Sequence, residues 1–337
     1  MAGETPANPA SLVVCQVRPL PEIPLPNPPP AEGVRVHWEQ LPAQLRAAIE
    51  ERIGSRVVEA VTQPGGFSPG LAARLRTTDG RRVFVKAVSE AGNPDSPDIH
   101  RREARVVAAL PAEAPVPRLL WSHDEGGWVA LCFEDIDGRL PAQPWMPEEL
   151  SEVVAAMQQL SSLLAPSPLP LEPASPWFAR NICGWRELLE TPDPQLDGWS
   201  TRNLQQLADL EATAPEWIEG DTLLHNDIRA DNILLSDRGV YFVDWPWART
   251  GAAFVDWVLF APSVTMQGGP GPEELLRRFD VGSVSATAIT AVVATLAGFF
   301  LAASRRPPPQ GLPTLRAFQA AQGEIAVEWL RERTAWD

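Results

Sequence analysis

Lysine is almost absent from this sequence. Of its 28 lysine and arginine residues, only Lys86 is a lysine. It lies in the apolar run VFVKAV (residues 83–88), which has the composition of a buried strand. Lysine is rarely buried without a partner, and its compact ammonium is not equivalent to the planar guanidinium of arginine. A chance survivor of an arginine-rich composition should lie on the surface, so this position favours a functional charge, such as one that holds phosphate oxygens.

Cysteine and excess basic charge are also scarce. The three cysteines, Cys15, Cys132 and Cys183, provide no disulfide framework, and we therefore expect a cytoplasmic protein. Acidic residues number 43 against 28 basic ones, a formal net charge of −15, so we expect no nucleic-acid partner. The N-terminus lacks the basic and apolar regions of a signal peptide.

One segment, residues 281–304, is uncharged and long enough to cross a membrane. Its large apolar residues follow a helical spacing, and alanine, threonine, serine and glycine fill the other positions. An apolar stripe on one face is typical of a helix packed inside a soluble domain, so we expect no membrane partner. The sequence makes no prediction of the oligomeric state.

By composition the chain divides into an arm and two lobes. Residues 1–33 are rich in proline and have little periodicity, as in an extended or disordered arm. Residues 34–134 predict a small antiparallel β lobe, with strands at 56–62, 71–76, 82–88, 118–123 and 128–134 and helices at 40–53 and 96–110. Residues 135–337 predict a larger helical lobe, with helices at 147–164, 177–189, 200–211, 285–304 and 313–333. The predicted fold class is therefore α+β, with two lobes.

A hairpin-like stretch, LLHNDIRADNILLSDRGVYFVDWPWA (residues 223–248), interrupts the helical lobe. Asp227 is followed five residues later by Asn232, and Asp244 ends the second strand pattern. Folding the hairpin at the turn SDRG brings Asn232 and Asp244 within about one register step of each other. An amide oxygen and a carboxylate are hard ligands that suit Mg²⁺ shared with phosphates.

The order and spacing of these residues closely resemble the aminoglycoside phosphotransferase / choline kinase-like family, whose members have the protein-kinase fold. The resemblance covers about residues 56–335. It implies that Asp227 accepts or orients the proton of a substrate hydroxyl, and that Asn232 and Asp244 bind Mg²⁺ between nucleotide phosphates. Arg229 matches a catalytic-loop position that faces the transferred phosphoryl group in protein kinases.

The same resemblance assigns two supporting residues. His225 is expected to support the catalytic loop structurally. Asp256, in GAAFVDWVLF, matches an aspartate that braces this loop from below. A helix N-cap or a surface carboxylate is the alternative for Asp256.

The resemblance also gives Lys86 a partner. In this family the third strand carries a lysine that contacts the α- and β-phosphates and pairs with a glutamate of the following helix. Lys86 and Glu103 occupy these positions. The alternative for Glu103 is pairing with the arginines beside it on the helix surface.

Two further stretches resemble the family's nucleotide contacts. In PGGFSPG, before the second predicted strand, the expected ATP-binding residues are Gly65, Gly66, Phe67 and Ser68, although a simple hairpin connection is the alternative. In LCFEDI the backbone groups of Glu134 and Ile136 are expected to bind adenine. Residues 34–134 would then be the nucleotide-binding lobe.

The resemblance therefore implies an ATP-dependent kinase that uses Mg²⁺ and phosphorylates a hydroxyl of a small molecule, such as an aminoglycoside or another amino alcohol or sugar. A catalytically inactive nucleotide-binding pseudokinase and a kinase for a neutral sugar or endogenous metabolite are the alternatives. A protein kinase is disfavoured, because Asp244 is followed by Trp-Pro-Trp and soon by Asp256. Candidate carboxylates for an amine acceptor are Glu148, Glu149, Glu152, Glu187, Glu190, Asp193, Asp197 and Glu216.

Overall fold

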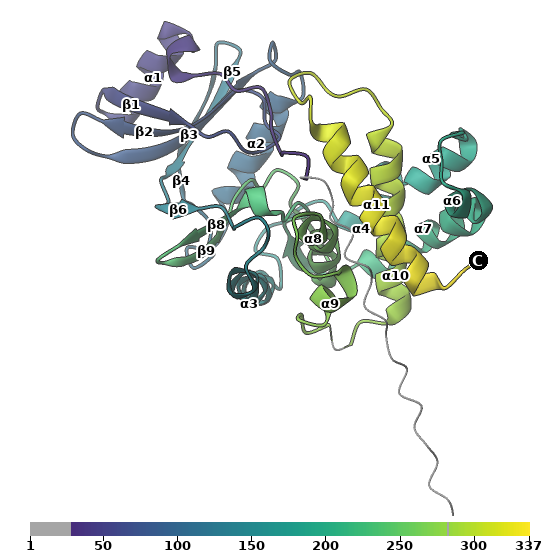
Figure 1. The fold of residues 1–337 in the computed structure, drawn as a ribbon. Helices are drawn as coiled ribbons and strands as arrows, with labels where there is room; N and C mark the ends of the chain where they lie inside the picture. Colours follow the sequence, from purple (N-terminus) through teal and green to yellow (C-terminus); the bar gives the residue numbers. More distant parts are fainter. Residues whose placement is uncertain (1–27, 282) are drawn as a thin grey trace, which may run out of the picture.

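The computed structural model describes residues 28–281 and 283–337, so the predicted arm falls outside it up to residue 27. A small lobe built on a β-sheet stands beside a larger helical lobe (Figure 1). The chain enters the helical lobe just after residue 139 and stays there to its end. This arrangement confirms the predicted two-lobed α+β fold.

The small lobe contains a five-stranded antiparallel sheet of order β1-β2-β3-β5-β4. Its strands are β1 (Val57–Thr62), β2 (Leu71–Thr77), β3 (Arg82–Ser89), β4 (Leu119–Glu125) and β5 (Trp128–Glu134). Helix α1 (Ala43–Ile53), which ends at Gly54 in the left-handed conformation, and helix α2 (Ser96–Val107) cover it.

Alternation along β3 and β5 divides the side chains between the two faces of this sheet. Val83, Val85 and Cys132 share a core cluster with residues of α1. Val88, Leu131 and Phe133 share the other core cluster with Val106 and Val107 of α2. Because successive side chains of a strand point to opposite faces, Lys86 lies on the α2 face together with Val88.

The helical lobe surrounds a core that is continuous with the α2 face of the sheet. Its helices are α3 (Pro147–Leu163), α4 (Ala174–Asn181), α5 (Gly184–Glu190), α6 (Gly198–Arg202), α7 (Leu204–Ile218), α8 (Phe254–Met266), α9 (Pro272–Leu276), α10 (Ala286–Ser304) and α11 (Leu315–Thr334). Helix α10 meets the length and hydropathy of a membrane span, but 72% of its most apolar window is buried inside the protein. It packs against α11, α7 and α5, as the interpretation of a core helix predicts.

Two small β-sheets flank the loops that lie between the lobes. Strands β8 (Ile233–Ser236) and β9 (Gly239–Phe242) form the predicted hairpin, and β6 (Gly138–Arg139) adds to its edge. Strand β7 (Thr222–Leu224) pairs with β10 (Arg249–Gly251).

Some boundaries differ from the prediction. The expected helix at 177–189 is two helices, α4 and α5, interrupted at Ile182 and Cys183. The expected helix at 200–211 is likewise divided into α6 and α7, and α7 continues to Ile218. Helix α2 ends at Val107 instead of residue 110. Helix α8 was not predicted, because it is buried on nearly every side and has no amphipathic stripe to detect.

Candidate active site

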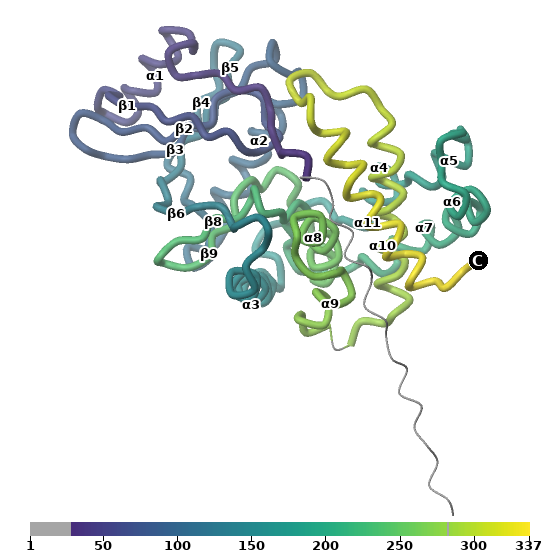
Figure 2. Tube along the Cα trace, in the orientation of Figure 1, coloured from purple at the N-terminus to yellow at the C-terminus, as the bar shows by residue number. Residues whose placement is uncertain are grey.

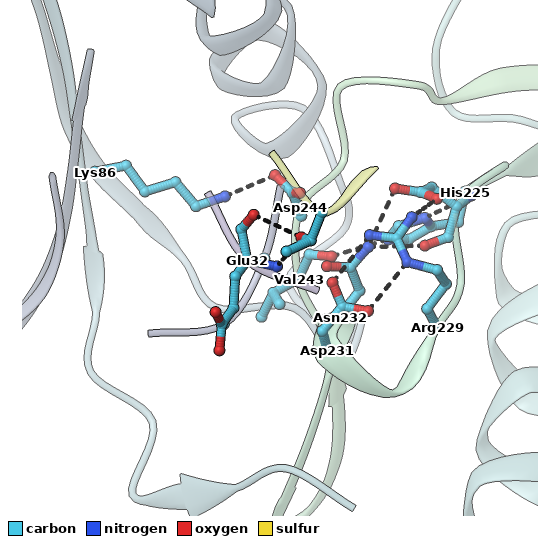
Figure 3. A network of polar contacts seen from close by, with 12 residues as sticks. Glu32, Lys86, His225, Arg229, Asp231, Asn232, Val243 and Asp244 are labelled. Carbon is cyan, nitrogen blue, oxygen red and sulfur yellow. Dashed lines mark hydrogen bonds and ion pairs between the residues drawn. The ribbon is translucent and has the colours of Figure 1, made fainter. Parts of the chain in front are cut away.

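Lys86 lies between two carboxylates that come from different lobes. Its Nζ is 2.7 Å from Glu103 Oε1 on α2 and 2.8 Å from Asp244 Oδ1, just beyond β9. Figure 3 shows the side chain reaching from the sheet toward Asp244. Burial alone would lower the pKa of Lys86, but the charges of Asp244 and Glu103 raise it above its ordinary value. The ammonium therefore stays charged, and it forms a direct link between the lobes.

His225, in the predicted catalytic loop, is held as a neutral group by hydrogen bonds at both ring nitrogens. His225 Nδ1 accepts the backbone N–H of Asp227 at 3.2 Å, and Nε2 donates to the carbonyl of Val243 at 3.0 Å. Complete burial lowers its pKa to about 4. These two bonds join the loop to the strand that leads to Asp244.

Asp256 lies beneath the same loop, in the first turn of α8. Its two carboxylate oxygens accept the backbone N–H groups of His225 and Asn226, both at 2.8 Å. Asn226 has a φ of 61°, a left-handed conformation that asparagine tolerates better than most residues. Burial raises the pKa of Asp256 to about 6. The carboxylate thus holds an unusual turn directly before Asp227.

Asp227 is surrounded by donors. The guanidinium of Arg229 donates to one carboxylate oxygen, and Asn232 Nδ2 lies 3.3 Å from the other. Arg229 also forms a two-pronged pair with Asp231, at 3.0 and 2.9 Å. Burial raises the pKa of Asp227 to about 7, although Arg229 opposes this. A carboxylate with a pKa in this range is suited to exchange a proton near neutral pH.

Asn232 and Asp244 lie side by side, as the hairpin predicts. The Val243 N–H donates to the Asn232 carbonyl at 2.9 Å, which places Asp244 one residue from the paired position. Asn232 Nδ2 donates to Asp227, so its amide oxygen is the atom left to bind a cation. In the described part of the chain, no cluster of three or more His, Cys, Asp or Glu side chains could hold a metal by itself. A cation here would need ligands from a bound partner such as phosphate.

The site opens into a cleft between the lobes. Lys86, Glu103, Asn232 and Asp244 line its inner end. Its walls are mainly apolar, from Ala72, Phe84, Val107, Val116, Phe133, Leu234 and Val243. A mainly apolar cleft with mixed charge at one end suits a ring system joined to an anionic chain.

The residues predicted to bind adenine, which form the hinge between the two lobes, lie in this cleft. Glu134 and Ile136 both line it. The Ile136 carbonyl accepts from Arg74 at 3.1 Å and from the Gly138 N–H at 2.9 Å, so it is already occupied. Within residues 28–281 and 283–337, the Ile136 N–H has no hydrogen-bond partner. The backbone N–H is thus the group that the hinge can offer to a ligand.

The loop before β2 is held by an arginine that the sequence analysis did not identify. Arg35 Nε donates to the carbonyl of Gln63 at 3.0 Å, and its two terminal nitrogens donate to the carbonyls of Ser68, Gly65 and Gly66. Burial lowers the pKa of Arg35, although the charge of Asp244 opposes this. Residues 31–36 run along the loop, and the Gly66 N–H donates to the Ala31 carbonyl at 2.8 Å.

The same segment contacts the helical lobe. The Val34 N–H donates to the Gly311 carbonyl at 2.8 Å, and Glu32 exchanges hydrogen bonds with Thr314. In Figure 2 the start of the described chain accordingly lies beside the turn before α11. The last residues of the range assigned to the arm therefore connect the loop to the other lobe.

Phe67 occupies a different place from the one predicted. Gly65, Gly66 and Ser68 line the cleft, whereas Phe67 packs edge-on against Phe318 of α11, with ring centroids 5.0 Å apart. The Arg229 guanidinium lies 5.4 Å from the Phe67 ring centroid and 5.7 Å from that of Phe318. The tip of the loop therefore reaches across the cleft and contacts the catalytic loop.

A sequence model of the phosphotransferase enzyme family (APH) matches residues 65–283, which include Lys86, Glu103, Asn232 and Asp244 at the inner end of the cleft. The chain belongs to this family. The predicted resemblance is thereby confirmed, and the matched range spans the loop, Lys86, the hairpin and Asp256.

Solved structures share the fold of this family member at low sequence identity. A thermostable mutant of aminoglycoside phosphotransferase APH(4)-Ia, in a ternary complex with AMP-PNP and hygromycin B, is 16% identical with a TM-score of 0.59, covering 88% of this chain and 100% of that one. Macrolide 2'-phosphotransferase type I is 16% identical with a TM-score of 0.54, covering 86% and 98%. Choline kinase from Cryptosporidium parvum Iowa II is 14% identical with a TM-score of 0.53, covering 83% and 88%. No match was found among curated proteins.

Several carboxylates predicted as amine partners are bound by arginines of this family member. These pairs are Glu149 with Arg139, Glu187 with Arg306, Asp193 with Arg305, and Asp197 with Arg331. Asp197 also caps α6 by accepting the backbone N–H groups of Trp199 and Ser200. The other four candidates, Glu148, Glu152, Glu190 and Glu216, form no ion pair within residues 28–281 and 283–337.

Proposed function

We propose that this protein is an ATP- and Mg²⁺-dependent kinase that transfers the γ-phosphoryl group to a hydroxyl of a small molecule. The observation that carries the proposal is the contact of Lys86 with both Glu103 and Asp244, at the inner end of a mainly apolar cleft. A buried ammonium between two carboxylates is positioned to contact phosphates on entry of a nucleotide. Family membership and structural neighbours crystallised with ADP or AMP-PNP support this proposal.

In the proposed reaction Asp227 orients the acceptor hydroxyl and accepts its proton. The hydroxyl oxygen forms a bond to the γ-phosphorus while the bond to the bridging β–γ oxygen breaks, and ADP leaves with that electron pair. Lys86 holds the nucleotide phosphates, and Arg229 offsets negative charge beside Asp227. His225 and Asp256 act only through the loop that they hold.

The residues present fit a Mg²⁺ ion. The Asn232 amide group donates through nitrogen to Asp227, which leaves its oxygen for a cation, and Asp244 supplies a carboxylate beside it. Asn232 and Asp244 would hold the ion, which would supply positive charge against that of the phosphates. Asp244 is suited to this task because Lys86 lowers its pKa against the effect of burial, so the carboxylate stays ionised.

In the proposed complex the nucleotide base lies in the apolar part of the cleft and accepts a hydrogen bond from the Ile136 N–H. Gly65, Gly66 and Ser68 lie along the phosphates. The Arg74 guanidinium fixes this hinge, since it contacts the carbonyls of Ile136 and Gly138. A cytoplasmic location is part of the proposal, and the lack of a disulfide framework among the three cysteines supports it.

The test is ADP release with Mg²⁺-ATP and a panel of amino sugars, neutral sugars and amino alcohols, with Asp227→Ala as the control. We expect AMP-PNP to bind more tightly with Mg²⁺ than with EDTA, and ADP release to require both an acceptor and Asp227. Failure of AMP-PNP to bind would overturn the proposal. Binding without turnover for any alcohol would favour a pseudokinase.

A further inference from the structure

A group of arginine and tryptophan side chains lies beside the catalytic loop, outside the nucleotide cleft. We call it the Arg–Trp cluster: Arg102, Trp177, Arg180, Trp247 and Arg249. The Arg249 guanidinium stacks 4.2 Å from the Trp177 ring centroid, and that of Arg102 lies 5.7 Å from the Trp247 centroid. The two tryptophan rings are 6.4 Å apart. The cluster therefore joins α2, α4 and the segment after Asp244.

Two hydrogen bonds tie this cluster to the catalytic loop. The Trp247 carbonyl accepts from Asn226 Nδ2 at 3.1 Å and from the Arg249 guanidinium at 3.2 Å. Asn226 directly precedes Asp227. Arg249 also pairs across the two-stranded sheet with Leu224, which precedes His225. Arg249 is thus linked, through the Trp247 carbonyl and through Leu224, to the segment that carries the proposed base.

The positive charge of the cluster is only partly balanced. Among the described residues, Glu172 pairs with Arg180 at 2.5 Å and with Arg249 at 3.6 Å, whereas no acid pairs with Arg102. One carboxylate against three guanidiniums leaves a surplus of positive charge. Burial, together with the charges of Arg102 and Arg180, lowers the pKa of Arg249 to about 10 against the effect of Glu172.

Two buried polar atoms of this region have no partner in the described structure. One is Nε of Arg249, whose side chain is 5% exposed, and the other is Oδ1 of Asn226. They flank the same Trp247 carbonyl. Buried polar groups are normally hydrogen-bonded, so the unpartnered Nε–H of Arg249 indicates a place that an accepting group of a ligand completes, whereas Asn226 Oδ1 would take a donor such as a hydroxyl.

From this arrangement we propose that the acceptor of the kinase carries an anionic group, a carboxylate or a phosphate, that binds to the Arg–Trp cluster while its hydroxyl faces Asp227. The inference rests on the proposed function and names the class of its acceptor. Guanidinium groups recognise such anions with two parallel hydrogen bonds, and Trp177 and Trp247 would cover an apolar or ring portion.

The test compares acceptors that differ mainly in charge. Two matched sets are suitable: D-glucuronate, D-glucose and D-glucosamine, and D-glycerate, glycerol and serinol. With Mg²⁺-ATP, we expect kcat/KM for the anionic member to exceed that of its neutral counterpart by about tenfold or more, because a charge-assisted hydrogen bond contributes about a tenfold gain in binding. The cationic member should be the poorest substrate of each set. Preference for the cationic member in either set would overturn the inference.

Variants separate the cluster from the general charge of the protein. Arg249→Gln and Arg102→Gln should each lower kcat/KM for the anionic member, mainly through KM, by about 10- to 100-fold more than for the neutral member. Arg101→Gln is the matched control, because this neighbour on α2 pairs with Asp98 and Asp124 instead. Equal losses for anionic and neutral members would assign the arginines a structural role and contradict the inference.

A second measurement applies if neither set is phosphorylated. This measurement records the quenching of the protein's tryptophan fluorescence by iodide, caesium and acrylamide, in the presence of Mg²⁺ and AMP-PNP. Subtracting the signal of the Trp247→Phe variant gives the contribution of Trp247. We expect iodide to quench this contribution more than caesium does, relative to acrylamide, and Arg102→Gln to reduce the difference. Preferential quenching by caesium would overturn the inference. Absence of AMP-PNP binding would instead remove the proposed function.

Discussion

Lys86 Nζ lies 2.8 Å from Asp244 Oδ1, although 158 positions separate the two residues in the sequence. The contact joins β3 of the small lobe to the segment after β9. Glu103 completes the arrangement on the other side of the ammonium. Burial raises the pKa of Glu103, and Lys86 opposes this, so each charge of the trio depends on the others.

We expect neither arginine nor methionine to replace Lys86. Lys86→Arg keeps the charge, but the planar guanidinium does not fit between the Glu103 and Asp244 oxygens, which lie 2.7 and 2.8 Å from Nζ of Lys86. The value of kcat/KM for Mg²⁺-ATP should therefore fall by about 100-fold or more. Lys86→Met should lose as much activity and also destabilise the fold by about 3 kcal/mol, because it leaves the buried Glu103 and the partly buried Asp244 without their counter-ion. Steady-state kinetics and urea unfolding measure the two effects.

The double variant Lys86→Met/Glu103→Gln serves as the control for charge. It should recover part of the lost stability and none of the activity, since Gln needs no counter-ion. Full activity in Lys86→Arg would contradict the assigned role.

The pH dependence of the reaction should report Asp227. Its pKa is raised to about 7, mainly by burial, and only the ionised form accepts a proton. We therefore expect kcat/KM to fall about tenfold per pH unit below that value and to level off above it. Asp227→Asn should lower kcat by about 10³-fold or more.

Arg229 supplies the check on this assignment. Its positive charge favours the ionised carboxylate, so Arg229→Gln should move the acidic limb to higher pH. A limb that stays in place in this variant, or one that persists in Asp227→Asn, would show that another group titrates.

The parts of the site that were predicted are those encoded locally. Asn232 and Asp244 come together through one tight hairpin, whose turn residues and apolar strands are visible in the sequence. The orientation of Lys86 follows from the alternation of β3. Helix and strand positions in the small lobe were predicted to within a few residues for the same reason, since each has its own periodicity and turn signal.

Contacts made over long sequence distances were not predicted. Arg35 meets its carbonyls across about 30 positions, from a stretch without periodicity beside a proline-rich arm. Phe67 was assigned to the nucleotide because it lies in the loop, but its partner Phe318 is on α11, far away in sequence. Helix α8 has no polar face, so its pattern does not distinguish a buried helix from another buried element.

The crossing of α5 and α10 should be sensitive to a single methyl group. A Cβ on Gly298 would lie 2.6 Å from the Trp185 ring and 2.8 Å from Glu211 Oε1. Trp185 is fully buried, and Glu211 accepts its backbone N–H, so neither side chain moves freely. We expect Gly298→Ala to destabilise the protein by about 1–3 kcal/mol in urea unfolding. Gly271→Ala is the control, because nothing lies within 4 Å of that position. Equal midpoints for the two variants would show that the helices can separate without cost.

The hydrogen bonds of Arg35 to the loop before β2, which we call the Arg35 clamp, should govern nucleotide affinity. Its guanidinium contacts the carbonyls of Gln63, Gly65, Gly66 and Ser68, and so fixes the loop over the end of the cleft where phosphates are proposed to bind. Without it these carbonyls lose their donor and the loop gains freedom that a nucleotide must remove on binding. We expect Arg35→Ala to raise KM for ATP about tenfold with a smaller change in kcat.

Arg35→Lys tests whether the geometry of the fork matters as well as its charge. A single ammonium cannot reach four carbonyls at once, so this variant should recover less than half of the lost binding free energy. Arg76→Ala is the matched control, since Arg76 forms an exposed pair with Glu59 on the same sheet. Calorimetric titration with AMP-PNP measures the affinity directly. An Arg35→Ala protein that binds AMP-PNP as tightly as Arg76→Ala does would show that the loop holds its shape without the clamp.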